Sequence, residues 1–203
     1  MSKVAVKDSK TEELIKEAAK KLFFAEGRFN ATTQEIADAA GVNRTLVNYY
    51  FRSRDTLFSL VLKDARTAMH QRMETYLEKA LDLRTKLAHV IDFYMEMAIE
   101  YPYIDTYMVT KMNEDSEADD QVFPDAGFKS RIKAFLQEIE SEMEKGNIRK
   151  SSPQQFFINF SALLTHPLCF NPMYRKMLNL SDKQYRQLIK ERKELILDLL
   201  FLK

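Results

Sequence analysis

The run from Asn43 to Arg54 gathers side chains that could bind a charged or hydrogen-bonding partner. It contains three arginines and no acidic residue, a local charge of +3 in a chain whose formal net charge is +1. If Arg44 to Phe51 forms a helix, one of its faces carries side chains that can read base edges in a DNA major groove. The residues on that face are Arg44, Thr45, Leu46, Asn48 and Tyr49.

The residues around this run predict a helix-turn-helix. Thr32 and Glu35 form a capping box that starts a helix of about two turns, and Gly41 ends that helix. Asn43 caps the next short helix. A small core between the two helices is expected from Ile36, Ala37, Ala40, Val42, Val47 and Phe51. The alternative is an ordinary corner of two helices with a solvated face, and the acid-free run beside exposed tyrosines argues against it.

The rest of the chain predicts an all-α fold of about nine helices. Its 203 residues include only four glycines and five prolines, fewer than a β-sandwich or an α/β fold needs for its turns. No segment shows the alternation typical of a strand. Caps and breakers, beginning with a capping box at Ser9, predict helices over 9–26, 32–40, 44–51, 53–81, 82–101, 102–112, 125–145, 153–170 and 181–203.

The composition argues against several other classes of protein. The single cysteine, Cys169, excludes an intrachain disulfide and a cysteine zinc site, and only His166 lies near it, so no metal site is expected. No phosphate loop, nucleophile elbow or dinucleotide motif is present, which leaves a small helical enzyme as a remote alternative. The polar first ten residues and the short apolar runs predict a cytoplasmic protein without a signal peptide or a membrane span.

Residues 27–58, GRFNATTQEIADAAGVNRTLVNYYFRSRDTLF, resemble the N-terminal domain of the tetracycline-repressor (TetR) family of bacterial transcriptional regulators. The resemblance covers about residues 9–66. It implies a three-helix helix-turn-helix DNA-binding domain over residues 1–53. A long fourth helix would join this domain to a larger helical ligand-binding and dimerisation domain over residues 54–203. It implies no cofactor and no enzymatic activity.

The resemblance also assigns roles to individual residues. By position, the family's phosphate contacts fall on Thr33, Tyr49, Tyr50 and Arg54. Its base-reading positions fall on Arg44, Thr45 and Asn48. Leu46 stands where a threonine is common and Asn48 where a tyrosine is common. Leu46 could touch a thymine methyl group and Asn48 could bond an adenine edge, so both are included among the base-reading residues.

A single helix-turn-helix binds DNA weakly, whereas two copies on a two-fold axis read a palindromic operator. The helix after Pro153 and the last helix are too apolar on too many sides to be simple surface helices. The family uses its last two long helices as an intersubunit bundle, so a homodimer is expected. The alternative is that these faces only cover the chain's own core. The predicted interface residues are Phe156, Phe160, Leu163, Leu188, Arg192, Leu195 and Leu199.

The middle helices are rich in methionine and aromatic residues, which suit an adaptable apolar pocket. By similarity to the family, they would enclose a small-molecule effector. The candidate lining residues are Phe93, Met97, Tyr101, Tyr107, Met108, Phe128 and Phe135. An ordinary core is the alternative for this cluster. The sequence thus predicts a repressor released by a small apolar or amphipathic ligand, or a regulator of the same fold that answers to a protein partner and has no small-molecule cavity.

Overall fold

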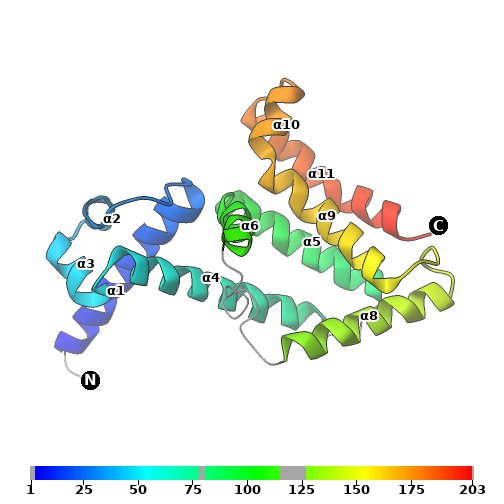
Figure 1. Ribbon diagram of the computed structural model, residues 1–203, viewed down its shortest axis with the longest axis horizontal. Helices are drawn as coiled ribbons and strands as arrows, with labels where there is room; N and C mark the ends of the chain where they lie inside the picture. Colours follow the sequence, from blue (N-terminus) through cyan, green and yellow to red (C-terminus); the bar gives the residue numbers. More distant parts are fainter. Residues whose placement is uncertain (1–2, 78–80, 115–126, 203) are drawn as a thin grey trace. The chain divides into compact units, whose positions relative to one another are not determined.

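The computed structural model describes residues 3–77, 81–114 and 127–202, and the regular elements there are helices (Figure 1). The one exception within these ranges is an isolated antiparallel bridge between Ile148 and Phe201. The all-α prediction is therefore confirmed. None of the helices in these ranges is long and apolar enough to cross a bilayer. The chain forms two compact units, unit 1 with residues 1–70 and 101–104 and unit 2 with residues 71–100 and 105–203.

The first helix of unit 1 starts earlier than the sequence predicts. α1 spans Lys3–Lys20, whereas the capping box at Ser9 predicts a start six residues later. No glycine or proline precedes Ser9, so nothing stops the helix from continuing toward the N-terminus. After α1 the chain widens into a π-helical turn, η1 (Lys21–Ala25), which turns three consecutive side chains into the core of unit 1, namely Leu22, Phe23 and Phe24.

Side-chain caps set the starts of the next three helices, as the sequence predicts. The side-chain oxygens of Thr32, Asn43 and Ser53 each accept a hydrogen bond from a backbone N–H two or three residues further along. These bonds satisfy donors that have no partner within the first helical turn. The three helices are α2 (Thr33–Ala40), α3 (Arg44–Phe51) and α4 (Arg54–Leu77). The first part of α4 belongs to unit 1, and the division into domains after residue 53 stays a prediction.

α2 and α3 pack against each other through the small core expected from the sequence (Figure 1). Gly41 has φ +65°, so it supplies the left-handed backbone of the tight turn between the two helices at no steric cost. Ile36, Ala37, Val47 and Phe51 are buried, whereas Ala40 and Val42 are half-buried. One face of α3 is thereby fixed inside unit 1, and the opposite face is left to solvent.

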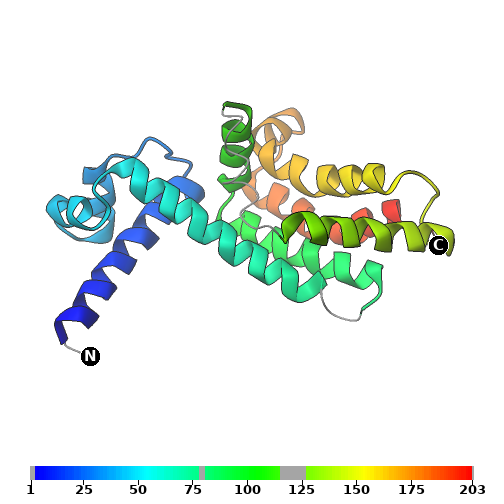
Figure 2. The same cartoon turned by 60° about the horizontal axis from the view of Figure 1, so that its bottom comes forward.

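Unit 2 is a bundle of helices around one apolar core. Figure 2 shows α5, α8, α9 and α11 running side by side, and residues from all four are buried between them. A short helix, α10, occupies the position where the sequence predicts only a break. The helices are α5 (Leu83–Glu100), α6 (Ile104–Glu114), α8 (Phe128–Glu144), α9 (Pro153–Cys169), α10 (Asn171–Met177) and α11 (Asp182–Leu200). The first residue of α6, Ile104, belongs to unit 1, and the rest of α6 belongs to unit 2.

A polar cluster joins three helices of unit 2. The Tyr94 hydroxyl on α5 donates a hydrogen bond to Oδ1 of Asp105 on α6 at 3.0 Å. Loss of water contacts raises the pKa of the Asp105 carboxyl, and the Tyr94 bond opposes that shift. Burial, followed by the nearby Asp105 charge, raises the pKa of the Cys169 thiol on α9 to about 11. Cys169 is therefore in its thiol form at neutral pH, and the thiolate is the reactive form.

The raised pKa of Asp105 predicts that Asp105→Asn stabilises unit 2 at neutral pH, by about 1–2 kcal/mol. Asparagine keeps the acceptor for Tyr94 but carries no charge to desolvate. As pH rises from the carboxyl's ordinary value of 3.8 through its raised value, the unfolded wild-type chain loses the proton first, so wild-type stability falls. Denaturant titrations of both proteins should therefore diverge as pH rises through this window. Equal stabilities at pH 7 would contradict the prediction.

Candidate nucleic-acid interface

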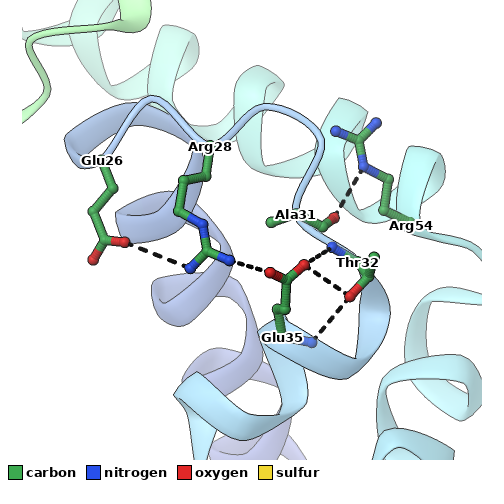
Figure 3. Close-up of polar contacts among 6 residues, drawn as sticks. All are labelled: Glu26, Arg28, Ala31, Thr32, Glu35 and Arg54. Atoms are coloured by element: carbon green, nitrogen blue, oxygen red, sulfur yellow. Dashed lines mark hydrogen bonds and ion pairs between the residues drawn. The ribbon is translucent and has the colours of Figure 1, made fainter.

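The start of α2 is held by a closed set of polar contacts (Figure 3). The Glu35 carboxylate accepts hydrogen bonds from the backbone N–H and the hydroxyl of Thr32 at 2.7 and 2.9 Å. Arg28, in the loop before α2, forms an ion pair with the same carboxylate. The bonds from Thr32, aided by Arg28, lower the pKa of Glu35. The sequence indicated the capping box, but nothing in it indicated the role of Arg28.

The first residues of α2 and α3 touch each other. The Arg44 guanidinium donates a hydrogen bond from Nε to the Thr33 hydroxyl at 3.2 Å. A predicted phosphate contact and a predicted base-reading residue are therefore adjacent, although they lie eleven positions apart in the sequence. Thr33 is the first residue of α2, where free backbone N–H groups favour a bound anion. The contact leaves the terminal nitrogens of Arg44 available for a further acceptor.

The predicted base-reading face of α3 is exposed. Val47 and Phe51 point into unit 1. The side chains on the opposite side of α3 therefore face solvent. The exposed residues include all four predicted base readers, Arg44, Thr45, Leu46 and Asn48. Tyr49 is 71% exposed and packs edge-on against the half-buried Tyr50, with ring centroids 5.2 Å apart. This face combines a cation, hydroxyl and amide groups and a leucine side chain without an intervening carboxylate.

Arg54 has a different environment from the one predicted for it. Its guanidinium lies over the rings of Phe23 and Phe58, at 5.3 and 5.1 Å from their centroids. Its Nε donates a hydrogen bond to the carbonyl oxygen of Ala31 at 3.4 Å (Figure 3), and its Nη1 pairs with Asp55 at 2.7 Å. Arg54 therefore packs inside unit 1. Its phosphate contact stays a prediction, and it would have to use guanidinium N–H groups that these contacts do not occupy.

The end of α3 contains a residue that sequence reasoning did not single out. Arg52 adopts φ +62°, a conformation that favours glycine, and its backbone N–H donates to the Asn48 carbonyl at 2.9 Å. Its side chain is exposed. Because an arginine in the left-handed region has no local sequence pattern, only the structure identifies this position as a sharp reversal between α3 and α4.

The candidate effector residues do not form one defined site. Tyr101 belongs to unit 1, where the Lys20 ammonium lies 5.6 Å from its ring centroid. Phe93, in unit 2, is buried under the Arg72 guanidinium, and Phe135 packs edge-on against Phe157. Met97, Tyr107 and Met108 are half-buried in unit 2. The side chain of Phe128 lies outside the described part of the chain. The set stays a prediction.

The predicted interface residues divide into two groups. Phe156 and Phe160 are buried in the core of unit 2, and their contact with a second chain stays a prediction. Leu188, Leu195 and Leu199 on α11 are 44%, 59% and 67% exposed. They line a groove of about 660 Å³ between α9, α10 and α11, together with the half-buried Leu163 and Arg192. Arg192 donates from Nη2 to the Leu163 carbonyl at 2.8 Å.

Residues 15–61 match a family model described as "Bacterial regulatory proteins, tetR family". Among solved structures, HlyIIR, a hemolysin II transcriptional regulator, shares 23% identity over 97% of this chain and 99% of its own, with a TM-score of 0.67. The ketosteroid transcriptional regulator KstR2 of Mycobacterium tuberculosis shares 16% over 96% of both chains, with a TM-score of 0.65. A TetR family transcription regulator from Marinobacter aquaeolei VT8 shares 15% over 98% and 100%, with a TM-score of 0.64. No curated protein matches the chain.

The packing of Arg54 predicts that Arg54→Leu destabilises unit 1 by about 1–3 kcal/mol, because the aromatic contacts and the Ala31 hydrogen bond are both lost. Arg54→Lys should recover only part of this loss, since an ammonium has no planar surface to stack. Arg52→Leu removes an exposed arginine two residues away and serves as the control. Chemical denaturation followed by circular dichroism measures all three. An effect of Arg54→Leu no larger than that of Arg52→Leu would contradict the assignment.

Proposed function

This chain belongs to the tetR family of bacterial regulatory proteins through its helix-turn-helix domain, and from that membership we propose that it is a dimeric repressor released from DNA by a small apolar or amphipathic ligand. As a member of a family of DNA-binding regulators, it regulates transcription and is not an enzyme. The observation that carries the proposal is the exposed, acid-free face of α3, presented by two capped helices packed on a common core.

We assign base reading to Arg44, Thr45, Leu46 and Asn48. Arg44 and Asn48 are one helical turn apart on the exposed face, so both can reach the floor of one major groove. A guanidinium suits the O6 and N7 acceptors of guanine, and a side-chain amide suits the N7 and N6 groups of adenine. Thr33 would hold a phosphate at the start of α2, with Tyr49 and Tyr50 as hydroxyl donors at the far end of α3.

Two reading helices need a dimer, and the groove face of unit 2 is the surface we propose for it. The exposed leucines of α11 form an apolar strip beside the groove, and strips of this kind mark contact surfaces in proteins that are otherwise polar outside. The bond from Arg192 to Leu163 ties α11 to α9 and fixes the shape of the face. Phe156 and Phe160 support it from the core of unit 2.

The proposed effector rests on the methionine and aromatic side chains of α5 and α6. Such side chains adapt to varied apolar ligands. One solved relative, KstR2, is a ketosteroid transcriptional regulator, and a ketosteroid is a largely apolar molecule. A ligand that prefers one arrangement of the reading helices must weaken DNA binding by its differential affinity for the two arrangements. A regulator that answers to a protein partner instead would show no thermal stabilisation by any apolar or amphipathic ligand.

Arg44→Ala should weaken binding to the operator by about 1–3 kcal/mol and relax the preference at one base pair in each half-site. Tyr49→Phe, which removes only a hydroxyl that would bond a phosphate, should weaken operator and scrambled duplexes by similar factors. The operator is first selected from a library of random duplexes, and fluorescence anisotropy then measures binding of each variant to both duplexes. If Tyr49→Phe changed base preference while Arg44→Ala weakened both duplexes equally, the assignment of the reading face would fail.

The combined substitution Leu195→Glu and Leu199→Glu should convert the protein to monomers, because two carboxylates would enter an interface from which water is excluded. Leu14→Glu replaces a comparably exposed leucine on α1 and should leave the dimer intact. Sedimentation velocity at micromolar concentration measures the oligomeric state of all three proteins. A double variant that is still dimeric, or a Leu14→Glu variant that dissociates, would contradict the proposed interface.

A further inference from the structure

A strained turn joins α3 to α4 at Arg52. This residue has φ +62° and ψ −47°, and the Ser53 N–H donates a hydrogen bond to the Phe51 carbonyl at 2.6 Å. A backbone bond of this span around a residue at positive φ makes a γ-turn, which is rare and strained for a residue with a side chain. Glycine adopts positive φ at no steric cost. The backbone of the turn therefore does not favour an arginine.

Contacts on both sides hold the turn in place. The Arg52 N–H donates to the Asn48 carbonyl at 2.9 Å and closes the last turn of α3. The Ser53 hydroxyl accepts a hydrogen bond from the Thr56 N–H at 3.0 Å and starts α4. Phe51, the residue before the turn, is buried in unit 1. A strained residue persists where its surroundings determine its conformation in this way, and such residues gather at functional sites.

The Arg52 side chain is exposed and has no partner in unit 1. Its guanidinium makes no ion pair, hydrogen bond or ring contact among the described residues. Arg54, two residues further along, differs in each respect. Its guanidinium lies over the rings of Phe23 and Phe58 and pairs with Asp55. The charge of Arg52 is therefore available to an external anion, whereas that of Arg54 is engaged within the unit.

The length of α3 brings Arg52 to the rim of the proposed DNA site. A helix of eight residues is about 12 Å long, and the major groove of B-DNA is about 12 Å wide. The first residues of a reading helix contact base edges in the groove. The far end of α3 then reaches the border of the groove, where the backbone phosphates lie. Tyr49 and Tyr50, the proposed hydroxyl donors to phosphate, are at the same end of the helix.

We propose that Arg52 binds a phosphate of the DNA backbone in each half-site, the contact that the resemblance to the family places on Arg54. A guanidinium forms two parallel hydrogen bonds with phosphate oxygens, and no described residue competes for the donors of Arg52. The inference rests on the proposed DNA binding and adds a backbone contact to it. A contact of this kind fixes the position of α3 on the duplex and carries no base preference.

The test compares the full-length wild type with Arg52→Gln, Arg52→Gly and Lys63→Gln. Glutamine removes the charge and keeps a side chain in the turn, whereas glycine removes both the charge and the strain. Lys63 is an exposed basic residue of α4, so Lys63→Gln is the control for the loss of one positive charge. Fluorescence anisotropy measures binding to the selected operator and to a scrambled duplex across a salt series. Circular dichroism follows the thermal unfolding of each variant.

We expect Arg52→Gln and Arg52→Gly to weaken binding to both duplexes by the same factor, at least about tenfold at about 0.1 M salt. The slope of log K against log salt should fall by about 0.9 for each lost contact, or about two for a dimer. Lys63→Gln should keep the slope of wild type. The unfolding midpoint of Arg52→Gly should exceed that of Arg52→Gln by about 2–4 °C, because glycine relieves the strain of the turn.

Three results would overturn the inference. The first is an Arg52→Gln variant with the salt slope of wild type, because no phosphate contact would then have been lost. The second is a loss of affinity confined to the operator, which would make Arg52 a base reader. The third is a weakening in Arg52→Gly that Arg52→Gln does not share, because the backbone and not the charge would then be responsible.

Wild type separates this inference from the proposed function. A wild type that selects an operator, while Arg52→Gln binds it equally tightly, leaves DNA reading intact and removes only the Arg52 contact. A wild type that prefers no duplex contradicts the proposed function itself, and the Arg52 contact falls with it.

Discussion

The geometry of unit 1 depends on the contacts that the guanidinium group of Arg54 makes. It lies on the rings of Phe23 and Phe58 and reaches the carbonyl oxygen of Ala31. It therefore joins η1, the loop that precedes α2, and α4. Because Thr32 caps α2 directly after Ala31, fixing this loop also fixes where α2 begins and, through their shared core, how α3 is presented. A half-buried guanidinium suits this role, since its flat faces stack on rings while its edge donates hydrogen bonds.

The polar groups around α3 are arranged so that its exposed face stays free of carboxylates. Glu35, the acidic residue of the first turn of α2, is held by Thr32 and Arg28. Asp55, at the start of α4, is paired with Arg54. These two carboxylates are thus held at the starts of α2 and α4, and neither Arg44 nor Arg52 is paired with a carboxylate among the described residues. A surface of this kind attracts a polyanion.

The basic residues of the two units show why burial alone does not reveal a role. Lys86 and Arg54 are satisfied by partners within their own units, so each contributes to the native packing. Arg66 is more deeply buried than Lys86 and has neither a carboxylate nor a ring among the described residues to balance its charge.

The local structure of this protein follows from short-range patterns in its residues. The starts of α2, α3 and α11 could be predicted because a cap and its partner lie two or three residues apart, and the exposed face of α3 follows from helical spacing. The start of α1 could not be predicted in this way. Its capping pair lies inside a run of residues that favour helix, so the helix continues past the pair toward the N-terminus. The packing role of Arg54 depends on the tertiary structure, because its surroundings come from residues at long sequence separation. The tertiary structure also shows that Phe156 points into the core of unit 2, whereas Leu199 faces solvent. Periodicity finds an apolar stripe on each helix, but it cannot tell whether the chain itself or a second molecule covers that stripe.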